Sequence, residues 1–331
     1  MKPVDFELHR PSTLAETLGL LASFGDEAKV LAGGQSLVPL LNFRLARPAH
    51  VIDIGLLGAP GGALDGTLGG RPGGALGGVR ADGPADDPVV AIGAMVRQAQ
   101  AERSPVVAAR CPLLAAALPW IAHPPIRARG TIGGSLAHAD PAAELPAVAV
   151  ALGATLIVTR SVPGPAPDGA AGSREAVRTR ALSAAQFYRG YLTTALADQE
   201  LLTEIRFPAA APRTGAAFAE VARRRGDFAL VGCAAQVTLS SGLIADVRIG
   251  LSGVAGVPVR GAAAEELLRR RPLDDALLAR AADDAAAGLS PPADLHGSGE
   301  YRRHLAAVLI RRTVVQAHER ARAQPFRGSP R

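Results

Sequence analysis

The stretch VLAGGQSLVPLLNFR, residues 30–44, joins two apolar runs through two glycines, a glutamine and a serine. A related pattern returns a hundred residues later in TIGGSLAHADPAAE, residues 131–144. Glycine allows close backbone approach and positive φ, and successive N–H groups in such turns form concavities that bind anions. Two glycine turns of this kind predict a ligand with two phosphates, held between segments that are distant in the sequence.

The residues around the first motif predict a compact βαβ unit. Short strands are expected at 6–9, 29–32 and 51–54, with a helix over 37–45. Another helix starts at Thr13, where Glu16 three residues later suggests a capping box. Residues 1–54 are therefore expected to place the first glycine turn at the end of a strand.

The middle of the chain alternates patterned segments with loose ones. Strands are predicted at 89–92, 154–158 and 201–207, and helices at 95–102 and 112–118. Residues 58–83 are glycine-rich and are expected to form a surface excursion, because they can bury little apolar area. Residues 120–129 are expected to be irregular, and 161–180 to form a second loose loop.

A boundary is expected near residues 209–214, followed by strands at 218–222, 230–239 and 245–251 and helices at 262–270 and 301–321. The arginines of the last helix are expected on a solvated face, and the tail after Gln324 is expected to fray. These arginines are Arg302, Arg303, Arg311 and Arg312.

Composition excludes several classes of protein. The 331 residues contain 48% hydrophobic residues, enough for real cores, and no apolar run long enough to span a bilayer is present. We expect no secretory signal and a cytoplasmic location. Cys111 and Cys233 are isolated, so no disulfide framework or iron–sulfur site is expected in this chain.

The net charge of +6 raises the alternative of a basic nucleic-acid-binding module. The basic residues are almost all arginine, however, which is typical of a high-GC coding bias, and aromatics are only 4% of the chain. Base-stacking platforms need more aromatic side chains than this. We therefore disfavour a nucleic-acid partner.

The two glycine motifs are not those of a classical nucleotide fold, because neither is GxGxxG and no Walker lysine follows. His123, His138 and Asp140 lie near the second motif, but their spacing is too loose for a metal site. We expect no metal site there and name no catalytic residue, because His138 and Asp140 are expected to order the loop or to lie close to a cofactor.

Several longer segments carry a family resemblance. They are AGGQSLVPLLNFRLARP (32–48), HPPIRARGTIGGSLAHADPAAELPA (123–147), GYLTTAL (190–196), ELLTEIRFP (200–208), RRRGDFALVG (223–232) and DLHGSGEYRRHLAAVL (294–309). Together they resemble the FAD-binding medium subunit of the molybdenum hydroxylases, which include carbon monoxide and xanthine dehydrogenases. The resemblance spans nearly the whole chain, with the motifs in the same order.

The resemblance implies an α+β fold, in which two subdomains of the vanillyl-alcohol oxidase (PCMH) type bind FAD and a C-terminal α+β domain covers it. The expected boundaries are 1–54 for the first FAD-binding subdomain, 55–212 for the second, and 213–331 for the C-terminal domain.

The resemblance also implies the residues that contact FAD. The pyrophosphate is expected against both glycine motifs, the adenosine end against Glu144, and the isoalloxazine near Ile121, Leu202 and Phe228. For Asp227, the residues themselves leave two roles open: accepting a hydrogen bond at the flavin edge, or ordering its own turn. The complete expected set is Leu31, Ala32, Gly33, Gly34, Gln35, Ser36, Leu37, Ile121, Thr131, Ile132, Gly133, Gly134, Ser135, Glu144, Leu202, Asp227 and Phe228.

The function implied is electron transfer in an oxidoreductase complex. A large partner subunit would carry molybdenum–pterin, a small one two [2Fe–2S] clusters, and the assembly would be a dimer of heterotrimers. Electrons would pass from the clusters through FAD to an external acceptor. A stand-alone FAD-dependent oxidase or reductase is the alternative from the sequence. It would show turnover without partner subunits.

Overall fold

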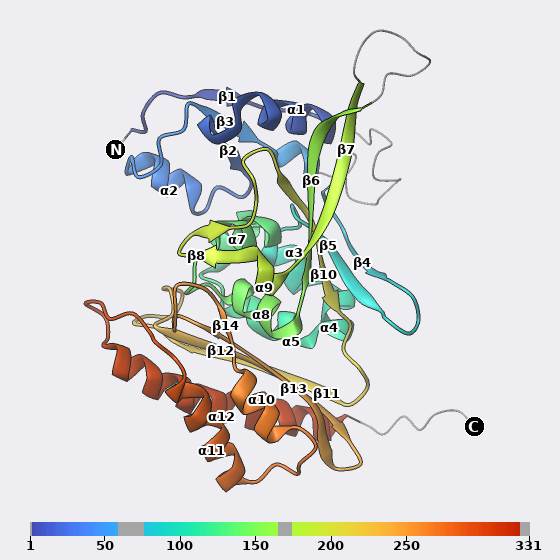
Figure 1. Cartoon of the computed structure of the whole chain (residues 1–331), viewed down its shortest axis with the longest axis vertical. Coiled ribbons are helices and arrows are strands. Elements are labelled where there is room, and N and C mark those ends of the chain that lie inside the picture. Colours follow the sequence, from blue (N-terminus) through green and yellow to red (C-terminus); the bar gives the residue numbers. More distant parts are fainter. Residues whose placement is uncertain (1, 59–75, 165–173, 325–331) are drawn as a thin grey trace.

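The computed structural model describes residues 2–58, 76–164 and 174–324. Along the long axis the chain forms an N-terminal unit, a middle unit built on a five-stranded sheet, and a C-terminal unit built on a four-stranded sheet (Figure 1). This mixture of sheets and helices confirms the α+β class. In the described ranges, every helix is too short or too polar to cross a membrane.

The N-terminal unit is a parallel three-stranded sheet with strand order β1-β3-β2, as the βαβ pattern predicted. Its elements are β1 (Glu7–His9), α1 (Leu14–Phe24), β2 (Ala28–Leu31), α2 (Leu37–Asn42) and β3 (His50–Asp53). Only half of the capping box forms. The Thr13 hydroxyl accepts from the Glu16 N–H at 3.1 Å, whereas the Glu16 carboxylate accepts from the N–H of Ser12.

The middle unit is an antiparallel sheet with order β4-β5-β10-β6-β7. Its strands are β4 (Val79–Asp82), β5 (Val89–Gly93), β6 (Thr155–Gly164), β7 (Arg174–Ser183) and β10 (Leu201–Pro208), and β8 (Tyr188–Gly190) pairs with β9 (Thr193–Thr194). Its helices are α3 (Gln98–Glu102), α4 (Pro105–Arg110), α5 (Pro112–Ala117), α6 (Pro124–Arg129), α7 (Ile132–His138), α8 (Glu144–Leu152) and α9 (Ala184–Phe187).

Two expectations for the middle unit are wrong. The segment 120–129 is not irregular, because Pro124 opens helix α6 at the first helical position, where a missing N–H costs nothing. The segment 161–180 is largely the paired strands β6 and β7, with only 165–173 outside the described residues. Strand β4 likewise occupies the end of the glycine-rich segment 58–83, of which 59–75 lie outside the described residues.

The C-terminal unit is an antiparallel sheet with order β11-β12-β13-β14. Its elements are β11 (Thr214–Val221), β12 (Val231–Ser240), β13 (Leu243–Ser252), β14 (Val259–Arg260), α10 (Ala262–Leu268), α11 (Asp275–Ala287) and α12 (Gly299–Ala323). Helix α11 was missed because its apolar face is mostly alanine. The expected fraying after Gln324 concerns residues outside the described part.

The predicted solvated face of α12 is wrong for Arg302. Its side chain is buried, and its guanidinium donates to the carbonyls of Leu230 and Gly253, at 2.6 and 3.3 Å, and to the Asp294 carboxylate at 2.7 Å. Arg302 therefore ties the start of β12 and the end of β13 to helix α12.

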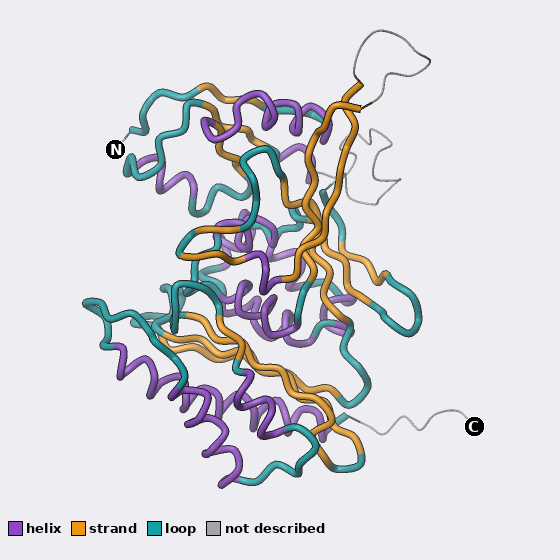
Figure 2. Tube along the Cα trace, viewed as in Figure 1, coloured by secondary structure: helices purple, strands orange, loops and turns teal. Residues whose placement is uncertain are grey.

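The two faces of the C-terminal sheet have different neighbours. Helices α10, α11 and α12 cover one face, and the other face meets the middle unit (Figure 2). Alternation along β11 explains this, because Ala217 and Ala219 pack among the C-terminal helices whereas Ala216 and Phe218 join the core of the middle unit. The domain boundaries at 54/55 and 212/213 stay a prediction.

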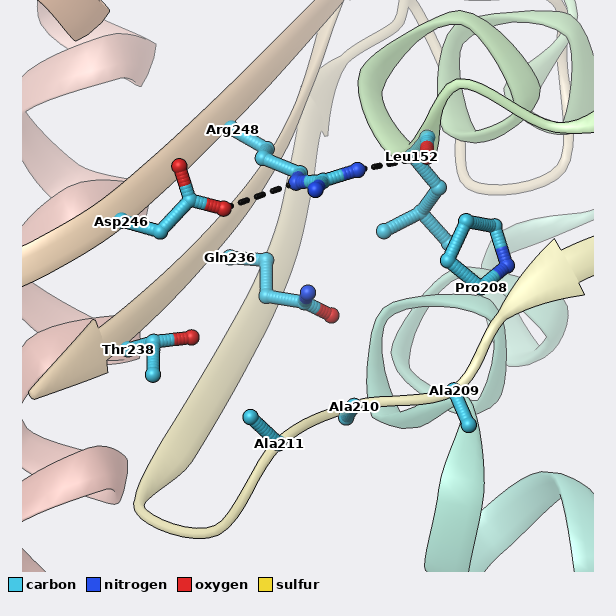
Figure 3. A pocket seen from close by; sticks show the side chains of 9 residues that line it. All are labelled: Leu152, Pro208, Ala209, Ala210, Ala211, Gln236, Thr238, Asp246 and Arg248. Atoms are coloured by element: carbon cyan, nitrogen blue, oxygen red, sulfur yellow. Dashed lines mark hydrogen bonds and ion pairs between the residues drawn. The ribbon is translucent and has the colours of Figure 1, made fainter. Parts of the chain in front are cut away.

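Arg248 marks the seam between the middle and C-terminal units. Its guanidinium donates to the Leu152 carbonyl at 2.7 Å and to the Asp246 carboxylate at 2.8 Å, beside a cavity of about 140 Å³ (Figure 3). Helix α8 packs closely against β13. A Cβ added at Gly250 on β13 would lie 2.2 Å from the carbonyl oxygen of Ala147 on α8. The C-terminal unit is thus packed directly on the middle one.

Candidate functional site

The two glycine motifs meet in space although about a hundred residues separate them. A Cβ on Gly33 would lie 2.6 Å from the carbonyl oxygen of Arg129 and 2.9 Å from the Cα of Gly130. A Cβ on Gly134 would lie 3.5 Å from the Cβ of Ala32. Only glycine at position 33 permits this approach, so the end of β2 rests directly on the entry to α7.

The first motif presents a run of unused backbone donors. In the described residues, four consecutive backbone N–H groups donate to no protein acceptor, those of Gly34, Gln35, Ser36 and Leu37. The first backbone hydrogen bond of the α2 turn comes after them, from the Val38 N–H to the Gly34 carbonyl. Gly34 holds φ at +74°, and the Gln35 side-chain Nε2 donates to the Gly33 carbonyl at 3.0 Å. Consecutive unpaired amides after a left-handed glycine form a ready anion cradle.

The second motif was expected to be a second glycine turn, and the structure shows it as the first turn of helix α7. Thr131 caps the helix, accepting from the Gly134 N–H at 3.0 Å, and the Ser135 N–H donates to the Thr131 carbonyl at 3.2 Å. The N–H groups of Ile132 and Gly133 donate to the carbonyls of Val96 and Ala94. The backbone amides of residues 132–135 in the second motif are therefore all bonded within the protein. A group left to bind a ligand is the hydroxyl of Ser135, which is half-buried.

Arg97 is a candidate binding residue that the sequence did not indicate, because it belongs to no recognisable motif. Its guanidinium donates to the Arg129 carbonyl oxygen, the same atom against which Gly33 packs. Arg97 forms no ion pair with a carboxylate in the described ranges. Burial, and after it the nearby Arg129 cation, lower the pKa of Arg97, whereas the Asp53 carboxylate opposes the shift. Two guanidinium groups and one carboxylate therefore interact at the junction of the motifs.

Leu202 is connected to the second motif through the backbone. It lies buried on β10 where the register with β6 shifts, and the neighbouring Thr203 carbonyl accepts from the Ala94 N–H at 2.9 Å. Ala94 in turn accepts from the Gly133 N–H at 2.8 Å. The structure therefore places Leu202 within two hydrogen bonds of the second motif.

Ile121 is buried and is held by Arg127. The Arg127 guanidinium donates to the Ile121 carbonyl at 2.9 Å and to the Glu102 carboxylate at 2.9 Å. Because Arg127 is itself buried, this ion pair and hydrogen bond fix the course of the chain between η3 (Leu118–Trp120) and α6.

Asp227 and Phe228 lie exposed on the loop between β11 and β12, and the Phe228 side chain is 66% exposed. The loop touches the middle unit at His123. A Cβ added at Gly226 would lie 2.5 Å from the His123 ring. A cleft of about 540 Å³ opens beside this contact. It is lined by Pro119, Trp120, Glu220, Ala222, Arg224 and Arg225.

Glu144 is half-buried at the start of α8 and lies close enough to the half-buried Glu220 on β11 for their charges to interact. Burial raises the pKa of Glu144 to about 7, helped by repulsion from Asp140. Burial likewise raises the pKa of Glu220 to about 8, and Glu144 adds to the effect. The expected contact between Glu144 and adenosine stays a prediction.

The loop after α7 is ordered by Asp140, whose carboxylate accepts from the Ala142 N–H at 2.8 Å. This is the local role expected for Asp140 from the sequence. His123 and His138 do not join it in a metal-ligand cluster within the described ranges. The contacts that define this site are therefore those of the glycine motifs, Arg97 and the cleft.

Comparison with known proteins identifies the domains. Residues 4–59 and 84–164 match the model of the FAD binding domain in molybdopterin dehydrogenase, and 216–317 match that of the CO dehydrogenase flavoprotein C-terminal domain. The 6-hydroxypseudooxynicotine dehydrogenase complex subunit alpha of Paenarthrobacter nicotinovorans is 38% identical over 97% of both chains. The carbon monoxide dehydrogenase medium chain of Hydrogenophaga pseudoflava is 34% identical, covering 97% of this chain and 99% of that one.

A solved structure of carbon monoxide dehydrogenase from Hydrogenophaga pseudoflava, lacking the Mo-pyranopterin moiety of its cofactor, contains a similar chain. It superposes with a TM-score of 0.83 at 36% identity, covering 97% of this chain and 99% of that chain. This protein therefore belongs to the family of FAD-binding medium subunits of carbon monoxide and xanthine dehydrogenases, and is the flavin-binding component of an oxidoreductase.

Proposed function

We propose that the FAD diphosphate is bound where the two glycine motifs meet. The observation that carries this proposal is the run of four backbone amides at 34–37, which donate to no acceptor among the described residues. Beside them lies the Arg97 guanidinium, which is hydrogen-bonded to the Arg129 carbonyl but forms no ion pair with a carboxylate in that part of the chain. Backbone amides and a guanidinium suit a diphosphate, because hydrogen bonds to charged oxygens are the stronger ones. The Ser135 hydroxyl adds a donor from α7.

The isoalloxazine is proposed to lie toward Ile121, Leu202 and Phe228. Supporting this placement, Thr203, the residue after Leu202, is joined to the second motif through Ala94. The cleft is lined by Trp120, which precedes Ile121, and by Arg225, on the same loop as Phe228. FAD supplies the redox chemistry, so the chain needs only to hold it, orient it and tune its surroundings. The exposed Phe228 ring offers an apolar surface that a bound flavin would cover.

Electrons are proposed to arrive from [2Fe–2S] clusters on a small partner and leave for an external acceptor, with molybdenum–pterin on a large partner and two heterotrimers in the assembly. The relatives named above as complex subunits or medium chains support a multi-subunit setting. Val38, Phe43 and Leu45, just after the first motif, are 42%, 64% and 74% exposed, which suits a surface covered in a complex.

Arg97→Gln in the flavin-free full chain tests the diphosphate site. Losing a charge-assisted hydrogen bond costs about 1.5–3 kcal/mol, which is roughly a ten- to hundredfold weaker FAD Kd. Arg280→Gln is the matched control, because Arg280 lies on α11 with a 64% exposed side chain. Flavin fluorescence titration measures both. Equal FAD affinity in the two variants would contradict the site, and absence of FAD binding by the wild-type chain would contradict the function.

The electron route needs a separate experiment with the assembled complex. Substrate oxidation is expected to reduce the flavin only when both partner subunits are present. Substrate turnover by the purified chain alone would instead favour the stand-alone oxidase or reductase.

A further inference from the structure

A cluster of three metal-ligating side chains lies in the N-terminal unit, outside the flavin site. Glu7 and His9 project from the same face of β1, being two residues apart on a strand. His50 begins the neighbouring strand β3 and is the register partner of Glu7. In the described part of the chain, these are the three His, Cys, Asp or Glu side chains whose ligand atoms come together within 4.8 Å.

The spacing of the three ligand atoms fits a tetrahedral ion. His9 Nε2 lies 3.1 Å from His50 Nδ1, and the Glu7 carboxylate lies 3.5 Å from His50 Nδ1 and 3.9 Å from His9 Nε2. Two nitrogens bound to tetrahedral zinc at about 2.0–2.1 Å are themselves about 3.3 Å apart. The three separations are thus close to those of atoms that share one ion, which would replace the present hydrogen bond between the two imidazoles.

The cluster is held in place by its surroundings. The Phe24 ring at the end of α1 stacks on the His50 ring, with centroids 3.7 Å apart and planes 14° from parallel, and also contacts the His9 ring at 4.9 Å. Both imidazoles are largely buried, with side chains 15% and 17% exposed, whereas the Glu7 side chain is 67% exposed. The ligand set is thus fixed on one side and open to solvent on the other.

We propose that Glu7, His9 and His50 bind a Zn²⁺ ion, with water completing its coordination. Two imidazoles and one carboxylate are a ligand set that zinc accepts, including in sites with an open position. The ion bridges β1 and β3 and so stabilises the folded N-terminal sheet in proportion to its binding.

The metal site and the first glycine motif lie at opposite ends of the same sheet. His50 pairs with Ala28, the first residue of β2, whereas the glycine motif follows Leu31, the last residue of β2. Three residues along a strand span about 10 Å. Zinc binding and FAD binding are therefore separable by experiment.

The test uses the full chain without a polyhistidine tag, freed of metal with a chelator and titrated with Zn²⁺ against a chromophoric competitor. One zinc per chain is expected, and His9→Gln and His50→Gln should each weaken its binding by at least about tenfold. Glu7→Gln should also weaken it, and its exposed position leaves folding intact. His304→Gln, an exposed histidine on α12, is the matched control and should bind zinc as the wild type does.

Two results would overturn the proposal. One is wild-type affinity in the double variant His9→Gln/His50→Gln, and the other is an equal loss of affinity in His304→Gln. FAD content and circular dichroism of each variant establish that it is folded. Unchanged FAD binding with lost zinc binding is the expected combination, because the two sites occupy opposite sheet ends.

Discussion

Replacing Gly34 by alanine should weaken FAD binding far more than it weakens the fold. Gly34 has φ of +74°, and an added Cβ would lie 3.2 Å from Val38 Cγ2 and 3.4 Å from Leu31 Cδ1. Alanine in this left-handed region costs about 1–2 kcal/mol. The turn relieves part of that strain by rotating, which redirects the amides of residues 34–37. Losing one such bond to a phosphate costs about 1.5–3 kcal/mol, or roughly a ten- to hundredfold weaker Kd.

The control for this experiment is Gly242→Ala in the turn between β12 and β13. Gly242 has φ of +81° and no atom within 4 Å of an added Cβ, so it carries the same backbone strain without touching the flavin site. Urea unfolding of the flavin-free proteins should show similar losses of stability, and FAD titration by fluorescence should separate them. An unchanged FAD Kd in Gly34→Ala, with the stability loss present, would refute the assignment of these amides to the diphosphate.

Two further predictions concern stability. Since burial raises the pKa of Glu144 to about 7 and of Glu220 to about 8, their contribution to stability is full below their ordinary pKa of 4.5 and is lost as pH rises through those values. For Glu144 the loss is of order 3 kcal/mol. Glu144→Gln should therefore reduce the fall of urea-measured stability between pH 4.5 and about 7, with Glu220 still contributing a fall up to about pH 8. An unchanged slope between pH 4.5 and 7 would contradict the burial argument. Arg302→Met should lower the unfolding free energy by about 3 kcal/mol, because it leaves two buried carbonyls without donors. The exposed Arg312→Met is its control, and equal midpoints in denaturant would argue against the buried role.

Local signals in the sequence predicted much of the secondary structure. The parallel N-terminal unit, β10 and most of the C-terminal strands follow from short apolar runs bounded by turn residues. The predictions failed where the local signal was ambiguous. Pro124 looked like a break but starts α6, and the alanines of α11 gave too little contrast between its faces. The family assignment also came from the sequence, because several separate motifs occur in the same order.

Local pattern placed two glycine motifs and a family signature in the chain, because backbone conformation and periodicity depend on near neighbours. Only the packed structure decided which amides remain free, since that depends on partners far away in the sequence. Packing put Gly33 against Arg129, brought the Arg97 cation to the same carbonyl, and buried Arg302 under the C-terminal sheet. It also placed Glu144 near Glu220 and gathered Glu7, His9 and His50. Such contacts join residues tens to hundreds of positions apart, and they exist only when the whole chain has folded.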